Sequence, residues 1–142
     1  MTNQIVMYTE AYMSKLDSSK PIEISKEFVS KLDLSHKNLL IIYSGNSRLI
    51  RTISVKSDYT IKIIIVIEKL LPDFVGSLGS LITNLKITPI YSSAICYYET
   101  YCTYEAYFEP NVLTDIKFDE FKVRVLDIKG VIDVISRNIV PT

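Results

Sequence analysis

An apolar run followed by an amphipathic stretch is the strongest pattern along this chain. Residues 61–67 are β-branched apart from one lysine, which predicts a strand covered on most of both faces. Pro72 and Asp73 come next, and both residue types favour the first turn of a helix. Apolar residues then recur every three or four positions, which predicts an amphipathic helix of about three turns. Its apolar stripe consists of Phe74, Val75, Leu78, Leu81, Ile82 and Leu85.

The residues after this helix predict a β-hairpin, a second amphipathic helix with a glycine C-cap, and a last strand. The predicted positions are 90–99 and 102–109 for the hairpin, 118–128 for the helix, Gly130 for its C-cap, and 131–140 for the strand. From residue 61 the order is therefore β-α-β-β-α-β, which is the order of a ferredoxin-like fold.

The first part of the chain predicts two short strands, a short helix with Ser25 as its N-cap, and a β-hairpin. The strands are expected at residues 4–13 and 21–24, the helix over residues 26–34, and the hairpin at 39–43 and 48–55. The sequence Ser-Gly-Asn-Ser between the hairpin strands supports a turn, because Gly and Asn accept positive φ. We therefore predict an α+β protein with a small β-rich domain at residues 1–57 and a ferredoxin-like domain at residues 58–142.

Composition favours a folded, globular chain. Of the 142 residues, 48% are hydrophobic and 23% are charged, which excludes a disordered protein. No apolar run reaches the ~20 residues that a membrane-spanning helix needs. The first residues contain neither the basic region nor the apolar region of a secretory signal. We therefore expect a cytoplasmic protein with no membrane partner.

Charge is unevenly distributed, although the net charge is zero. Residues 1–57 contain eight Lys and Arg against five Asp and Glu, and residues 58–142 contain eight against eleven. A weakly basic first part fits contact with a polyanion. The same distribution also fits attraction between the two parts across a dimer, and chance is the third explanation.

The two cysteines lie in the predicted second hairpin. A turn near residues 100–101 would place Cys102 opposite Glu99 and Cys96 opposite Glu105, so we predict two free thiols in a reducing compartment. A metal site would need further ligands, and the only histidine, His36, is distant in sequence. We expect no metal and no cofactor.

Two stretches in the second part carry a family resemblance. The first helix opens with Pro-Asp-Phe-Val at residues 72–75, and the last strand opens with Gly-Val-Ile-Asp-Val at residues 130–134. With the order of elements, these motifs make residues 60–140 similar to an ACT domain, a small ligand-sensing module in amino-acid metabolism. The resemblance implies that backbone N–H groups at the helix start bind an amino-acid carboxylate. The implied site consists of Leu71, Pro72, Asp73, Phe74, Val75, Gly76 and Thr88.

Two positions depart from the family pattern, since Asp73 replaces a glycine and Thr88 replaces an asparagine. An aspartate would compete with a bound carboxylate. The loop is therefore either an amino-acid site or an ordinary first turn in which Asp73 balances the helix dipole. Likewise, Gly76 and Gly79 either admit a ligand or a partner helix, or lie on a solvent face.

The first part has a resemblance of its own. A turn at residues 15–21, the sequence Ile-Ser-Lys-Glu-Phe-Val at residues 24–29 and the hairpin at residues 39–55 are similar to the swapped-hairpin DNA-binding domains of the AbrB/SpoVT type. Ser25 stands where that family has proline. The resemblance implies an intertwined dimer that grips DNA with basic side chains. Those residues would be Lys15, Lys20, Lys26, Arg48 and Arg51, and the alternative is a solvated surface.

No Gly-rich phosphate loop, nucleophile elbow or His-Glu metal motif occurs in the sequence, so we do not expect an enzyme. The tyrosines of the second hairpin are interleaved with glutamates, which favours aromatic packing in a sheet face or dimer interface over base stacking. The favoured hypothesis is a ligand-responsive regulatory protein and homo-oligomer. Its ACT-like part would sense a small molecule such as an amino acid, and its first part would bind DNA or a protein partner. The alternative is an assembly module without a ligand, which oligomerises or docks on a metabolic enzyme.

Overall fold

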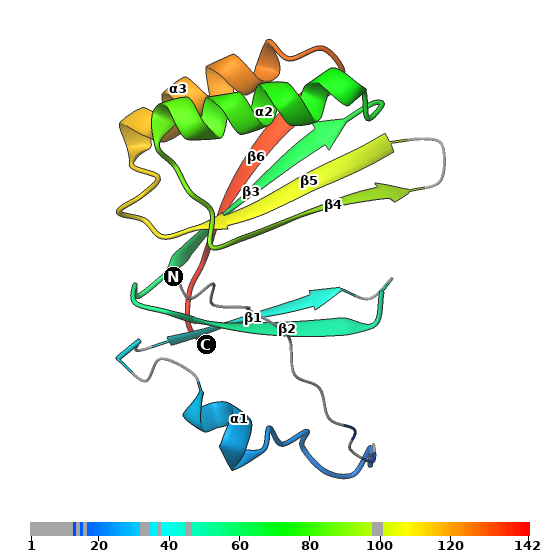
Figure 1. The fold of residues 1–142 in the computed structure, drawn as a ribbon, viewed down its shortest axis with the longest axis vertical. Coiled ribbons are helices and arrows are strands. Elements are labelled where there is room, and N and C mark those ends of the chain that lie inside the picture. Colours follow the sequence, from blue (N-terminus) through cyan, green and yellow to red (C-terminus); the bar gives the residue numbers. More distant parts are fainter. Residues whose placement is uncertain are drawn as a thin grey trace, which may run out of the picture. The chain divides into compact units, whose positions relative to one another are not determined.

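The computed structural model describes residues 13, 15, 17–31, 35, 36, 38–44, 47–97 and 101–142 (Figure 1). The chain divides into two compact units, Met1–Leu32 and Asp33–Thr142. Among the described residues, no helix is long and apolar enough to cross a membrane. The strand predicted over residues 4–13 lies, apart from Met13, outside this described part of the chain.

The described part of the first unit contains one short helix, α1 (Lys26–Ser30). It starts after Ser25, as predicted, and the Ser25 carbonyl accepts a hydrogen bond from the Val29 N–H at 3.0 Å. The prediction of a short strand at residues 21–24 is wrong, because residues 21–25 pair with no described strand. Ile22 and Ile24 are 71% and 42% exposed, so their alternation does not reflect a buried face.

The second unit contains two antiparallel sheets and two helices, which confirms the α+β class. Its elements are β1 (Asn38–Ser44), β2 (Leu49–Val55), β3 (Thr60–Ile67), α2 (Pro72–Leu85), β4 (Tyr91–Tyr97), β5 (Tyr101–Phe108), α3 (Asp115–Leu126) and β6 (Val131–Ile139). The predicted first hairpin is β1 with β2. The other strands form a four-stranded sheet in the order β4-β5-β3-β6, and every neighbouring pair is antiparallel.

Helices α2 and α3 cover one face of the four-stranded sheet, and the β1–β2 hairpin lies against the other (Figure 1). The hairpin therefore belongs to the same compact unit as the sheet, although it precedes residue 58. The boundary predicted between residues 57 and 58 concerns domains that fold independently, and it stays a prediction.

The main core lies between the sheet and its helices. Alternate residues of β3, namely Ile63, Ile65 and Ile67, are fully buried there. Phe74 of α2 and Phe121 of α3 pack into the same cluster. Each such side chain contributes about 2 kcal/mol by burial, so this cluster holds both helices in place.

The second helix ends earlier than its sequence suggests. Thr114 is the N-cap of α3, and its hydroxyl accepts a hydrogen bond from the Lys117 N–H. The helix ends at Leu126 with Asp127 as its C-cap, so the prediction of Gly130 as the cap is wrong. Gly130 instead has a φ of 92° in the turn before β6, where an added Cβ would lie 3.1 Å from the Lys69 carbonyl oxygen. A side chain at this position would be strained.

The register of the second hairpin overturns the prediction of two free thiols. Tyr97 pairs with Tyr101, so Cys96 and Cys102 lie directly opposite each other and form a disulfide. The predicted turn was placed too close to β5, and because register follows the turn, every cross-strand partner was misassigned. Because the two cysteines are paired, they no longer indicate a reducing compartment, and a cytoplasmic location stays a prediction.

Candidate functional site

A cavity of about 350 Å³ lies where α2 begins and α3 ends. It is lined by Leu71, Asp73 and Phe74, three of the seven residues predicted for a ligand site. The packing of the two helices adds charged groups that the sequence patterns did not indicate. These are Arg124, Asp127 and Lys129, from the last turn of α3 and the residues that follow it.

The local sequence leaves the start of α2 open to an acceptor. Pro72 lies in the first turn, where a missing N–H costs nothing. Leu71 is the N-cap, and its side chain makes no capping hydrogen bond. The Phe74 N–H donates to the Leu71 carbonyl at 3.0 Å, so the helix dipole and the remaining first-turn N–H groups favour a negative group at this end of the helix. Asp73 is exposed and Phe74 is buried, so the first turn presents both a charge and an apolar anchor.

The cavity lining is electrically balanced. Arg124 and Lys129 are basic, whereas Asp73 and Asp127 are acidic. The Arg124 guanidinium lies 3.3 Å from the Glu120 carboxylate, but this is an exposed pair one helical turn apart and is worth little. A ligand with one negative and one positive group would find a partner for each.

Other predicted ligand residues do not line this cavity. Val75 and Gly76 are exposed on α2, and a Cβ added at Gly76 or at Gly79 would meet no atom within 4 Å. Among the described residues, then, neither glycine is required for close packing. Thr88 follows the opposite end of α2, a helix of 14 residues that spans ~21 Å. The structure does not bring Thr88 to the start of the helix.

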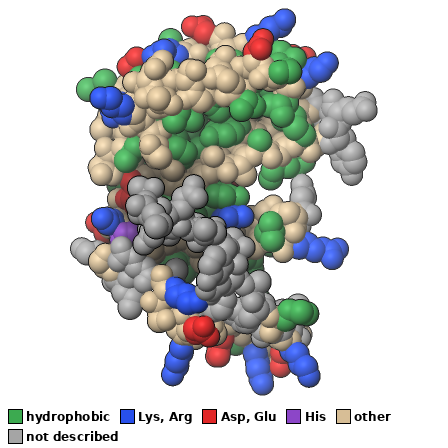
Figure 2. Space-filling model, in the orientation of Figure 1, with side chains coloured by type: hydrophobic (Ala, Val, Ile, Leu, Met, Phe, Trp, Pro, Cys, Tyr) green, Lys and Arg blue, Asp and Glu red, His purple; other side chains and the backbone are tan. Residues whose placement is uncertain are grey.

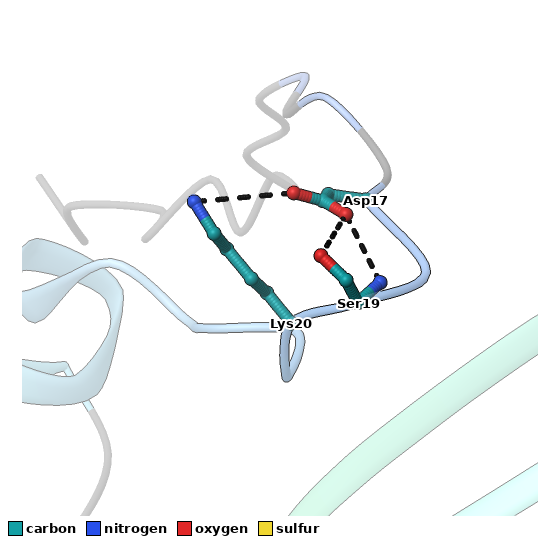
Figure 3. A network of polar contacts seen from close by, with 3 residues as sticks. All are labelled: Asp17, Ser19 and Lys20. Carbon is teal, nitrogen blue, oxygen red and sulfur yellow. Dashed lines mark hydrogen bonds and ion pairs between the residues drawn. The ribbon is translucent and has the colours of Figure 1, made fainter.

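The five predicted DNA-binding residues fall in different units. Lys15, Lys20 and Lys26 are exposed in the first unit. The Lys20 ammonium lies 3.9 Å from the Asp17 carboxylate, which also accepts hydrogen bonds from the Ser19 hydroxyl and N–H (Figure 3). The bonds from Ser19 lower the pKa of Asp17. Over the helical layer of the second unit, acidic and basic side chains are interspersed (Figure 2).

The remaining two basic residues belong to the β1–β2 hairpin. Arg48 is exposed and has a φ of 53° in the turn before β2. Arg51 points toward the four-stranded sheet, since its guanidinium lies 4.6 Å from the centre of the Tyr91 ring. Arg51 thereby lines a second cavity, of about 360 Å³, between the hairpin and the sheet. DNA binding by the five basic residues stays a prediction.

Sequence reasoning did not find the second cavity. Lys62, Glu105 and four tyrosines line it together with Arg51. The one available signal was the run of tyrosines in the second hairpin, which predicted aromatic packing on a sheet face. Burial raises the pKa of the Tyr107 hydroxyl above its ordinary value, although the nearby Lys62 charge opposes this shift. Tyr107 therefore remains protonated near neutral pH.

Comparison with protein-family models gives no match, and comparison with curated proteins gives none either. Among solved structures, the chain is similar to the uncharacterized protein TM1266 from Thermotoga maritima, with 10% sequence identity and a TM-score of 0.35. The similarity covers 59% of this chain and 96% of that one. A similarity at this level supports no inference about function, so the functional argument rests on the residues of the chain itself.

Proposed function

We propose that this chain is a ligand-responsive regulatory protein whose C-terminal part is a ferredoxin-like, ACT-like domain that binds an amino acid. The strand order supports the ferredoxin-like assignment. Each helix connects two strands that are separated in the sheet by one other strand: α2 joins β3 to β4 around β5, and α3 joins β5 to β6 around β3. This is the split β-α-β connectivity of that fold.

The cavity at the start of α2 carries the functional proposal. A free amino acid has a carboxylate and an ammonium group on one carbon. The carboxylate would bind near the helix start with Arg124 and Lys129, where the dipole and both cations attract it. The ammonium group would bind Asp73 and Asp127. The aspartate that departs from the family pattern thus becomes a binding partner of the ligand, and Leu71 and Phe74 offer apolar surface to its side chain.

Regulation would follow from the position of this cavity between two helices. A bound ligand would contact the first turn of α2 and the end of α3 at once, and would favour one relative placement of these helices. Any partner or DNA contact that prefers the same placement is then coupled to the ligand, with a reciprocal effect on affinity.

The test is a thermal-shift screen of the full-length protein against the twenty amino acids, followed by titration calorimetry. A ligand at a hundred times its dissociation constant adds about 2.7 kcal/mol to the free energy of unfolding. Arg124→Gln and Lys129→Gln should each weaken binding about tenfold, because a charge-assisted hydrogen bond is lost. Lys122→Gln, which changes an exposed cation of α3 outside the cavity, is the control. If no amino acid shifts the transition at millimolar concentration, the amino-acid site is wrong.

A second candidate function is assembly, and the outward face of the β1–β2 hairpin favours it. Four large apolar side chains are exposed on this face, which contradicts the usual pattern of a hairpin with one solvated side. They are Leu39 at 41%, Ile41 at 62%, Tyr43 at 73% and Ile50 at 58%. Under this function the hairpin would pair with a second copy of the chain.

A further inference from the structure

We propose that the cavity between the β1–β2 hairpin and the four-stranded sheet is a second binding site, for a small aromatic compound that carries one carboxylate or phosphate group. This site is separate from the proposed amino-acid site, because the two cavities share none of the lining residues that the structure describes. The helices that line the first cavity and the hairpin that lines the second lie on opposite faces of the sheet (Figure 1).

The hairpin is fixed to the sheet at one end of the cavity. Leu40, Val55 and Tyr107 are buried together in a small apolar cluster. Beside it, the Glu109 carboxylate accepts hydrogen bonds from the Lys56 N–H, at 3.2 Å, and from the Ser57 hydroxyl. These contacts hold the ends of the strands near residue 55, so the cavity toward the turn of the hairpin has a defined wall.

Arg51 supplies the anion-binding group of this cavity. Its guanidinium carbon lies 4.6 Å from the centre of the Tyr91 ring, a cation–π contact, and the side chain is exposed, so its N–H groups can reach a ligand. Among the described residues, no carboxylate forms an ion pair with Arg51. A guanidinium fork binds a carboxylate or a phosphate through two parallel hydrogen bonds.

The other charged groups of the cavity neutralise each other. The Lys62 ammonium lies 3.1 Å from the Glu105 carboxylate, and both side chains are mostly buried, at 20% and 24% exposure. Among the described residues, the lining therefore carries one uncompensated positive charge, on Arg51. A single anionic group on the ligand matches it.

The flat part of the ligand would contact tyrosine rings. Tyr91 and Tyr97 of β4 line the cavity and are half-buried. Tyr107 of β5 is buried and supports Tyr91, with ring centres 6.3 Å apart at an angle of 33°. Ring faces of this kind bind other aromatic rings through offset packing. A volume of about 360 Å³ is at the small end of ligand pockets, so it suits one or two rings rather than a larger cofactor.

The experiment is titration calorimetry of the full-length protein with four probes of this chemistry. Two are aromatic carboxylates, p-hydroxybenzoate and indole-3-carboxylate, and two are mononucleotides, AMP and UMP. Benzamide, adenosine, acetate and inorganic phosphate test whether the ring and the charge are both needed. We expect one probe class to bind at least tenfold more tightly than its neutral and ringless counterparts. Binding of the aromatic carboxylates would show that the anionic group is a carboxylate, and binding of the mononucleotides would show that it is a phosphate.

Variants locate the binding in this cavity. Arg51→Gln should weaken binding about 10- to 100-fold, because it removes a charge-assisted bidentate contact. Arg48→Gln is the matched control, since Arg48 is an exposed arginine of the same hairpin outside the cavity. Glu105→Gln should strengthen binding several-fold, because it leaves Lys62 without its counter-charge.

Three results would overturn the proposal. One is the absence of binding by all four probes at millimolar concentration, and another is equal binding of the neutral and anionic compounds. The third is an equal effect of Arg51→Gln and Arg48→Gln. Arg124→Gln affects only the amino-acid cavity, so its result separates a failure of the proposed function from a failure of this inference.

Discussion

Tyr107 is a buried residue that contacts both the apolar cluster under the hairpin and a charged side chain. It is 5% exposed, it closes the small cluster under the hairpin, and its ring lies 5.5 Å from the Lys62 ammonium. Burial raises the pKa of its hydroxyl in the folded protein, whereas the unfolded chain ionises near the ordinary pKa of about 10. The neutral ring is thus part of the folded state, and alkaline pH should act on it.

The prediction concerns stability at high pH. Above pH ~10 the unfolded chain loses the Tyr107 proton before the folded protein does, so the stability from this group is complete below that pH and falls as pH rises toward the folded pKa. Wild-type protein should therefore lose more free energy of unfolding between pH 9 and pH 11 than Tyr107→Phe does. Urea unfolding at several pH values measures this difference. Tyr101→Phe, at a 44% exposed position, should behave as wild type, and equal losses in wild type and Tyr107→Phe would contradict the prediction.

At the scale of elements, the disulfide joins β4 to β5 at the turn end of their hairpin. The cross-link closes a short loop, because the two cysteines are six positions apart in sequence. Reduction, or the double substitution Cys96→Ser with Cys102→Ser, should lower the free energy of unfolding by about 2 kcal/mol, mainly by freeing the unfolded chain. Denaturant unfolding with and without a reducing agent measures the loss. Intact-mass analysis is the check: two extra hydrogens before reduction would mean that the disulfide is absent.

The positions of helices and strands could be predicted from the sequence where hydrophobic periodicity alone defines them. The β-branched run of β3 and the three-to-four spacing of α2 each have one interpretation, and both elements lie where predicted. The register of β4 with β5 could not be predicted from the sequence. The residues between them, Tyr-Glu-Thr at positions 98–100, include no Gly, Asn or Pro that would fix a turn type. A misplaced turn then separated two cysteines that are partners.

Neither candidate cavity could be predicted as a whole. Arg124 and Lys129 meet Asp73 only because α3 packs beside α2, and helix packing is not encoded in a local pattern. Arg51 and Tyr107 are likewise far apart in sequence and share a cavity because the hairpin folds back on the sheet. The sequence motifs located one wall of the first cavity, and the tertiary fold supplied the opposite wall.

For the whole molecule, the two cavities and the outward face of the hairpin are separate places for the three proposed activities. The first cavity lies on the helical side of the sheet, and the second lies between the sheet and the inward face of the hairpin. Of the four exposed apolar side chains on the outward face of the hairpin, Tyr43 alone lines one of these two cavities. An assembly that buries this face would leave the start of α2 accessible to a ligand.

Assembly through the hairpin gives the last prediction. Ile41 is 62% exposed at the middle of β1, opposite Thr52, so a lysine there can reach water in a monomer but would bury a charge in a dimer. Light scattering after size exclusion should show that wild-type protein is a dimer or larger and that Ile41→Lys is a monomer. Because the position is exposed, the variant's own free energy of unfolding should change by no more than about 0.5 kcal/mol. Ile116→Lys, at an 81% exposed position of α3, should leave the oligomer intact. A monomeric wild type would mean that the chain does not assemble with itself, and equal dissociation by both variants would mean that the interface is not this face. In either case the exposed apolar side chains of the hairpin would need another partner.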